Sequence, residues 1–259
     1  MAIDVFSRYE NKYKLNGRMF RKVQAAIADN MEADKFNRGG EMYTIRNIYY
    51  DAPDFSLIRR SLSKPLYKEK VRLRAYGEVD EKSDVFVEIK KKFSGLVSKR
   101  RSLLKLGEAY DFLRDGTLPQ IQEYMNAQVL REAQYIIERE KLRPALYLAY
   151  ERFAYFGLGH HDLRVSFDAD IRTRRENVRF EYGDYGEPLL EADTWLMEIK
   201  VASSIPVWLC RVLSENGIVP LSFSKYGAEY TKALVNKLNG GEKECSILYF
   251  PQQVMLRSA

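Results

Sequence analysis

Charged residues recur at every second position in five stretches of this chain, where a strand would ordinarily keep one apolar face. In the clearest stretch, residues 67–76, the charges are Lys68, Lys70, Arg72 and Arg74. The other four carry Arg8, Glu10, Lys12 and Lys14; Glu88, Lys90 and Lys92; Lys99 and Arg101; and Glu198 and Lys200. Because successive side chains of a strand point to opposite faces, each set lines one face. The apolar residues between the charges need a core on the other face.

The charged faces can lie either in bulk water or inside a barrel wide enough for a highly anionic ligand. Four like charges in a row repel one another unless water or an anion separates them. Guanidinium groups bind phosphate through two hydrogen bonds, and ammonium groups act as point charges. Further cations that could converge on such a ligand are Arg152, Arg164 and Lys225. A triphosphate or a phosphate polymer, unlike a mononucleotide, could engage so many cations.

Three carboxylates share these faces with the cations. Glu10, Glu88 and Glu198 are each two positions from a lysine or arginine. In a phosphate site, carboxylates bind Mg²⁺ or Mn²⁺, which bridges phosphate oxygens. Alternatively, they form ion pairs that keep the basic residues oriented. We favour metal binding for Glu198, and the two roles stay open for Glu88, the second candidate ligand, and for Glu10.

Composition narrows the chemistry further. The net charge of +6 and the isoelectric point of about 9.1 favour anionic partners. Phosphoryl transfer needs positioning, charge neutralisation and a metal rather than a covalent nucleophile. The chain offers no catalytic triad, because its only histidines, His160 and His161, are adjacent in a glycine-rich turn. It has neither a P-loop nor a GxGxxG motif, so any bound ATP would be held by other residues. Nucleic acid is disfavoured, since the aromatic residues lie mainly opposite the charges or in helices.

The order of the patterns predicts one α+β domain with about eight main strands. Strands are expected at 5–15, 43–51, 67–76, 84–92, 96–104, 145–156, 163–173 and 195–201, and helices at 17–31, 107–141, 206–216 and 226–238. Residues 1–240 would form the domain and 241–259 a C-terminal tail. We find no signal peptide and no apolar run of membrane-spanning length, which favours a cytoplasmic setting without a membrane segment.

Nine pieces of sequence in a fixed order resemble the VTC domain, the polyphosphate polymerase module of the triphosphate tunnel metalloenzyme superfamily. They are RYENKY, IYYDAPDF, KEKVRLRAYG, VFVEIKKK, VSKRR, YERFAY, RVSFDADI, MEIK and FSKY, and they extend from about residue 6 to 235. The resemblance implies an eight-stranded antiparallel β tunnel, or barrel, with flanking helices. It also implies transfer of the ATP γ-phosphate to a growing polyphosphate chain, with release of ADP and a requirement for Mn²⁺ or Mg²⁺.

The same resemblance implies roles for individual residues. The catalytic cations would be Lys12, Arg72, Arg74, Lys90 and Lys225. Substrate contacts would come from Glu10, Lys70, Lys99, Arg101, Arg152, Arg164, Lys200 and Ser224, and Glu198 with Glu88 would bind the metal. The expected partners are ATP and inorganic polyphosphate, and any coupling to membrane transport would need a membrane protein as a further partner.

Two alternatives stay open. A hydrolase of the same fold would cleave triphosphate or polyphosphate with water as the acceptor. A non-catalytic polyphosphate-binding module would keep the cations but would not need Glu198. Metal dependence separates the binding module from both enzymes.

Overall fold

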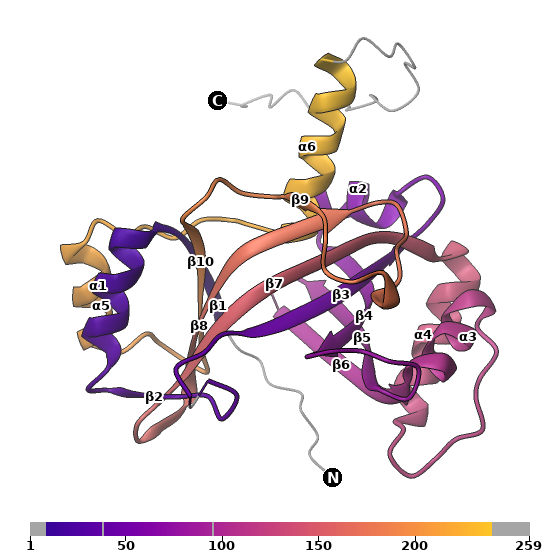
Figure 1. Ribbon diagram of the computed structural model, residues 1–259, viewed down its shortest axis with the longest axis horizontal. Coiled ribbons are helices and arrows are strands. Elements are labelled where there is room, and N and C mark those ends of the chain that lie inside the picture. The colour runs from indigo at the N-terminus through magenta and orange to yellow at the C-terminus, as the bar shows by residue number, and fades with distance from the viewer. Residues whose placement is uncertain (1–8, 38, 95, 240–259) are drawn as a thin grey trace, which may run out of the picture.

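The computed structural model describes residues 9–37, 39–94 and 96–239 and consists of a large antiparallel sheet flanked by helices (Figure 1). Along the main path the strands are β1 (Tyr9–Asn16), β10 (Thr194–Val201), β8 (His160–Arg174), β7 (Arg143–Gly157), β3 (Tyr43–Asp51), β4 (Tyr67–Tyr76), β5 (Asp84–Phe93) and β6 (Leu96–Lys105). Two short strands, β2 (Met31–Ala33) and β9 (Glu187–Pro188), pair with β7 and β8. The predicted α+β class and antiparallel sheet are confirmed.

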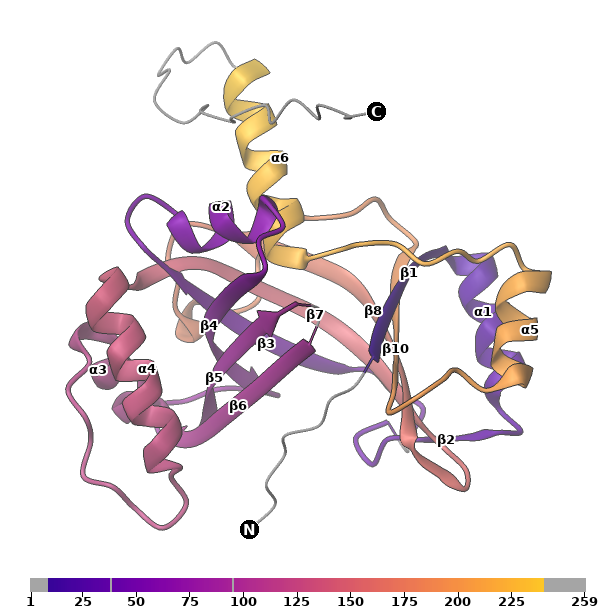
Figure 2. The same cartoon turned by 180° about the vertical axis from the view of Figure 1, so that it is seen from behind.

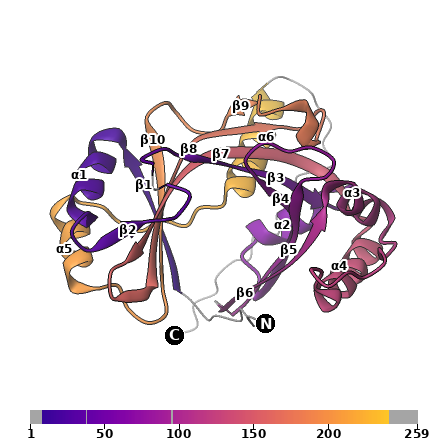
Figure 3. The same ribbon diagram turned by 60° about the horizontal axis from the view of Figure 1, so that its bottom comes forward.

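The sheet curves into an arch. Figure 3 shows β1 and β10 in one leg, β4 to β6 in the other, and β7 with β8 across the top. The two edge strands are β1 and β6, and no backbone ladder joins them within the described residues. The predicted tunnel is therefore present, but its sheet does not close into a barrel.

Helices α3 (Leu106–Asp115) and α4 (Ala127–Glu140) cover the outside of the leg that contains β4 to β6 (Figure 2). The apolar residues that alternate with the charges, such as Val71, Leu73 and Val87, are fully buried against these helices. The predicted single helix at 107–141 is wrong. Gly116 ends α3 with a φ of 84°, a left-handed conformation that suits glycine, and α4 begins eleven residues later.

Helices α1 (Gly17–Ile27) and α5 (Val207–Glu215) cover the outside of the other leg. The ring of Phe20 stacks on Trp195, with 3.6 Å between centroids, and meets the edge of Phe167 at 5.1 Å. The side chain of Asn16 caps α1 by accepting a hydrogen bond of 2.9 Å from the backbone N–H of Met19. Both legs thus bury their apolar faces outward, which leaves the charged faces inside the arch.

One end of the inner face is apolar and is closed by α2 (Ser56–Leu62) and α6 (Lys225–Asn239). The fully buried carboxylate of Asp51 joins three elements here. It accepts hydrogen bonds from the backbone N–H groups of Leu57 (2.9 Å) and Ile58 (3.1 Å) in α2, and from the hydroxyl of Tyr226 (2.8 Å) in α6. Asp51 therefore replaces a side-chain cap for α2, whose own N-cap residue, Phe55, provides none.

A single-turn 3₁₀ helix, η1 (Phe180–Tyr182), lies in the connection between β8 and β9. Among the described residues, no helix has both the length and the apolar character needed to cross a membrane. Arg8 and the predicted tail at 241–259 lie outside the described residues, so the predicted boundary at residue 240 stays a prediction.

We expect Tyr226→Phe to lower the free energy of unfolding by about 1.5–3 kcal/mol, because it removes a hydrogen bond to the buried Asp51 carboxylate. Tyr230→Phe is the matched control, since Tyr230 is also buried in the same helix and its hydroxyl makes no hydrogen bond within the described residues. Urea denaturation measures both. Equal losses in the two variants would contradict the role assigned to Asp51.

Candidate functional site

The strand register brings the predicted cations together on the inner face of the arch. Lys70 of β4 lies opposite Lys90 of β5, which lies opposite Lys99 of β6. In the next row, Arg72 lies opposite Glu88. On the other leg, Lys12 pairs in register with Glu198, and Lys200 with both Glu10 and Arg164. The alternation seen in the sequence thus becomes a tunnel lining with charges on both walls.

Glu88 is the centre of one wall and is only 1% exposed. Its Oε2 lies 2.6 Å from Arg72 Nη2 and 3.7 Å from Arg74 Nε, and its Oε1 lies 2.6 Å from Lys99 Nζ. Burial alone would raise the pKa of Glu88, but Arg74, Arg72 and Lys99 hold it well below its ordinary value. The carboxylate therefore stays ionised and offsets the repulsion among its three cations.

Neutral side chains complete the orientation of the two arginines. Arg72 Nη1 donates to the Tyr49 hydroxyl at 3.2 Å, and Arg74 donates to Asn47 Oδ1 at 3.0 Å and to the Tyr150 hydroxyl at 3.3 Å. Burial would raise the pKa of Tyr49, but Arg72 and Lys70 lower it to about 8. These three partners come from β3, which pairs with β4, and from β7 on the other side of β3, so the neighbouring strands fix the guanidinium groups before any ligand arrives.

Asp168 is the centre of the opposite wall, and it is not among the site residues predicted from the sequence. Arg152 donates to both of its carboxylate oxygens, at 2.6 and 2.8 Å, and Lys225 also pairs with it. Burial would raise the pKa of Asp168, but Arg152 and Lys225 lower it to about 2. Asp168 continues the alternation of Arg164 and Ser166 in β8, so the charge pattern itself could have revealed it.

Glu198 and Glu10 are the carboxylates on the leg formed by β1 and β10. Glu198 lies 2.6 Å from Lys200 Nζ and 3.7 Å from Lys12 Nζ, and Glu10 pairs with Lys90 of the other leg at 2.8 Å. Burial would raise the pKa of Glu198, but Lys200, Lys12 and Lys90 hold it well below its ordinary value. An ionised carboxylate facing the tunnel is thus available on this wall.

The donor set fits a hard divalent cation only in part. No group of three histidine, cysteine or acidic side chains suited to a metal occurs in the described part of the chain. Mg²⁺ commonly takes one or two carboxylates and completes its shell with water and substrate phosphates, so Glu198 with a phosphate ligand meets that requirement. Beside Glu198 lies a cavity of about 20 Å³, also bordered by Lys12, Asp168 and Lys225, which has room for one water-sized group. Glu88, by contrast, is engaged by three cations in this structure.

The segment between α5 and α6 spans the open side of the arch. The backbone N–H of Leu221 donates to the carbonyl of Lys12 at 2.7 Å, and Lys12 Nζ donates to the carbonyl of Phe223 at 2.9 Å. One residue further on, Ser224 Oγ accepts a hydrogen bond of 2.8 Å from Lys70 Nζ. The extended conformation of this segment therefore connects β1 to β4 and brings Ser224 and Lys225 into the lining.

Two predicted residues lie away from these clusters. Arg164 pairs with Asp34 at 3.2 Å and packs over the ring of Phe156. Arg101 is exposed, with its guanidinium carbon 4.6 Å from the centroid of Phe86. Neither contacts Glu88, Asp168 or Glu198 through an ion pair in the described residues, so their predicted substrate contacts stay predictions.

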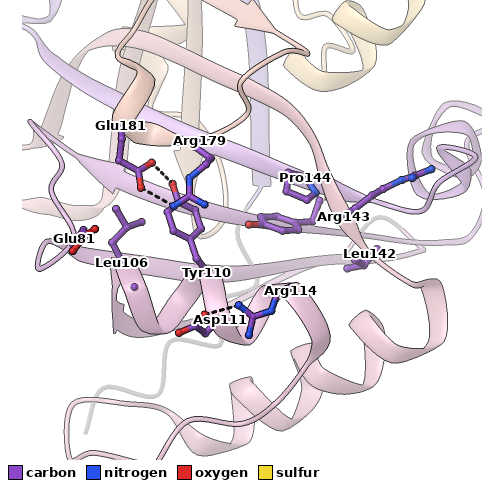
Figure 4. Close-up of a pocket in the computed structure, with 12 residues that line it drawn as sticks. Glu81, Leu106, Tyr110, Asp111, Arg114, Leu142, Arg143, Pro144, Arg179 and Glu181 are labelled. Carbon is purple, nitrogen blue, oxygen red and sulfur yellow. Dashed lines mark hydrogen bonds and ion pairs between the residues drawn. The ribbon is translucent and has the colours of Figure 1, made fainter.

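A larger cavity of about 540 Å³ lies away from the tunnel (Figure 4). Leu106 and Tyr110 of α3 line one side of it, and Arg179 and Glu181 from the segment around η1 line another. The Tyr110 hydroxyl donates to Glu181 at 3.0 Å, and Arg179 stacks over the Tyr110 ring. None of the predicted site residues borders this cavity.

Comparison with known proteins agrees with this geometry. The VTC domain family model matches residues 7–234. A curated relative, vacuolar transporter chaperone complex subunit 4 of Schizosaccharomyces pombe, is 27% identical over 194 residues, which are 66% of this chain and 27% of the relative. The chain thus spans about a quarter of the length of that relative.

Two solved structures share the fold. A candidate adenylate cyclase from Bacillus halodurans aligns with a TM-score of 0.51 and 15% identity, over 84% of this chain and 95% of its own. A candidate adenylyl cyclase from Hippeastrum, described as having a dominant triphosphatase activity, aligns with a TM-score of 0.50 and 12% identity, over 86% of this chain and 95% of its own. The family match covers most of the chain, and the arch agrees with the fold of these neighbours, so the chain belongs to the VTC domain family and has the triphosphate tunnel fold.

Proposed function

We propose that this protein is a polyphosphate polymerase that uses ATP. A terminal oxygen of the polyphosphate chain attacks the γ-phosphorus, the bond to the β–γ bridging oxygen breaks, and ADP leaves with the electron pair. The observation that carries this proposal is the pair of opposed cation clusters, one on Glu88 and one on Asp168, inside a single tunnel. The match to the VTC domain and to a VTC complex subunit supports a function that involves polyphosphate.

The chain's own residues supply positioning and charge neutralisation. Arg72 and Arg74 are oriented by Glu88, Tyr49, Asn47 and Tyr150, so their guanidinium groups need little rearrangement to bind phosphate oxygens. Lys99 keeps 40% of its side chain exposed and is accessible from the lumen. Together these groups would offset the charge that develops on the leaving ADP.

Lys12 and Lys225 would hold the polyphosphate chain on the facing wall. Lys90, which reaches from β5 to Glu10 of the other leg, and Lys70, which donates to Ser224, would hold it from the side of Arg72. The triphosphate tunnel fold implies a divalent metal, and we propose Glu198 as its principal protein ligand, with Mn²⁺ or Mg²⁺ as the ion. A metal held there would supply positive charge to offset that of the phosphate groups. Glu88 stays a second candidate ligand, although its ion pairs favour an orienting role.

A metal-dependent triphosphatase or polyphosphatase is the second candidate function. It would use the same cations, with water in place of the polyphosphate acceptor. The Hippeastrum neighbour is described as a triphosphatase, but at 12% identity it informs only the fold. We further propose a membrane-protein partner, because the curated relative is named as a subunit of the vacuolar transporter chaperone complex. A cytoplasmic location stays a proposal from the sequence alone.

The direct test is incubation of the purified protein with ATP and Mn²⁺, with polyphosphate read on a gel and ADP measured in parallel. The proposal expects long-chain polymer together with ADP. Nucleotide or phosphate release without polymer would establish the hydrolase instead. Tight polyphosphate binding without turnover in either Mn²⁺ or Mg²⁺ would leave only the binding module.

We expect Arg72→Ala to remove activity and also to destabilise the fold by about 3–5 kcal/mol, because Glu88 would lose a principal partner for its buried charge. Arg72→Lys should keep more of that stability, since it keeps a positive charge beside Glu88. Its turnover should stay at least about tenfold below wild type, because an ammonium group cannot bind phosphate through two parallel hydrogen bonds. Thermal unfolding and initial rates separate the two effects, and wild-type turnover in Arg72→Lys would contradict a catalytic role for the Arg72 guanidinium.

Glu198→Gln should reduce metal-dependent turnover by roughly 100-fold, because an amide is a poorer ligand than a carboxylate for Mn²⁺ or Mg²⁺. Tripolyphosphate binding without metal should be largely kept, since the surrounding lysines are unchanged. Glu215→Gln, an exposed change on α5, is the matched control. Rates across a Mn²⁺ titration give the readout, and an unchanged metal dependence would remove Glu198 from the metal site.

Tripolyphosphate affinity should fall about tenfold between pH 7 and pH 9 through Lys70. Burial lowers the pKa of Lys70 to about 8, and a bound anion would raise it, so binding takes up a proton. Affinity is therefore greatest below pH 7 and declines as the pH rises through 8. Titration calorimetry at several pH values measures this, and Lys70→Arg, which stays charged throughout, should show a shallower decline. Parallel profiles for the two proteins would contradict the role of Lys70.

A further inference from the structure

Two loops meet at one end of the leg formed by β4, β5 and β6. The backbone N–H of Ser94, in the β5–β6 hairpin, donates to the carbonyl of Leu66, in the loop between α2 and β4, at 2.8 Å. In the last row of the sheet, Tyr67 lies opposite Phe93, which lies opposite Leu96. We call this end the distal tip and define it by Leu66, Tyr67, Phe93 and Leu96 with the lysines Lys64, Lys68 and Lys92.

The apolar side chains of the distal tip are exposed. Leu66 is 74% exposed, Leu96 63%, Phe93 61% and Tyr67 41%. Helix α4 covers the outer face only as far as the neighbouring rows, where Arg139 pairs with Glu69 and Glu132 pairs with Lys91. The last row extends past this helix, so its apolar residues form a contiguous patch of the kind that usually contacts a partner.

The lysines of the tip are not neutralised. Lys68 and Lys92 lie opposite each other in register, and neither they nor Lys64 has an ion-pair partner among the residues that the structure describes. Burial, together with the charges of Lys92 and Lys64, lowers the pKa of Lys68, which indicates that the three lysines are close together.

The nearby carboxylates cannot offset these lysines, because they are already engaged. Glu69 pairs with Arg139, Glu132 with Arg100 and Lys91, and Glu140 with Arg60 and Arg139. The distal tip therefore combines exposed apolar side chains with uncompensated positive charge.

We propose that the distal tip docks on the surface of an anionic lipid bilayer. Apolar side chains on a protruding end can enter the interfacial region of a bilayer, and lysines beside them attract anionic headgroups. Free polyphosphate would account for the lysines but gives no reason for four exposed apolar residues. A peptide that paired with the edge strand β6 could contact Leu96, but it would leave Leu66 and Tyr67, which lie at the start of β4 two strands away, exposed.

Docking in this way would orient the tunnel. Lys68 and Lys92 follow Lys70 and Lys90 directly on the inner face of β4 and β5, so the tip forms part of one rim of the tunnel. A tip held at a bilayer would turn that rim towards the membrane. The proposal concerns a surface outside the catalytic clusters and does not depend on the polymerase activity.

The test is co-sedimentation of the full chain with vesicles of phosphatidylcholine, with and without phosphatidylglycerol, in buffer free of polyphosphate. We expect binding only to the anionic vesicles. The triple variant Leu66→Ser/Phe93→Ser/Leu96→Ser should bind at least about tenfold more weakly, and Lys64→Gln/Lys92→Gln should weaken binding about as much. Matched controls are Leu158→Ser/Val219→Ser and Lys22→Gln/Lys82→Gln, which remove exposed apolar or basic residues elsewhere and should bind like wild type.

Three results would overturn the proposal. The first is no binding to anionic vesicles while circular dichroism shows the wild-type chain to be folded. The second is an equal loss of binding in the tip variants and the controls, which would show that vesicle binding depends on net charge rather than on the tip. The third is a wild-type dimer that the triple variant converts to a monomer in light scattering without a change in vesicle binding, which would show that a second copy of the chain covers the tip.

Discussion

The rest of the tunnel depends on the ionised carboxylate of Glu88. It lies in the sheet where two arginines and a lysine would otherwise repel one another in a poorly solvated space. An exposed ion pair contributes little to stability, but loss of one partner from a buried pair costs several kcal/mol. The positive wall is therefore stable without ligand, because its counter-charge is built into the neighbouring strand. Asp168 does the same for Arg152 and Lys225 on the facing wall.

The arrangement of the helices follows from the same alternation. Each leg of the arch has one apolar face, and each is covered by its own pair of helices, α3 with α4 and α1 with α5. A flat sheet with these residues would expose its charged face to water. By covering only the outsides, the helices leave the charges to face one another across the arch, and α2 with α6 closes the apolar end of the inner face.

Much of this could be predicted from the sequence, because side-chain direction in a strand is a local property. Lys70, Arg72 and Glu88 share one face of the sheet, as the alternation predicts. The pairing of Arg152 with Asp168 could not be predicted, since it depends on the register of two strands. The break at Gly116 was missed because helical periodicity resumes after a loop. The bridge between Lys12 and Leu221 could not be predicted either, since it joins residues that are distant in sequence.

Because the sheet is open, no β-ladder fixes the distance between its two edge strands in the described residues. Within the described residues, the legs meet through Glu10 with Lys90 and through the segment that carries Phe223 and Ser224, rather than through a β-ladder. A partly exposed ion pair contributes about 1 kcal/mol or less, whereas separating a ladder breaks several backbone hydrogen bonds in register. The two edge strands can therefore move apart by breaking this ion pair, while the hydrogen bond of Leu221 to Lys12 keeps the spanning segment on β1.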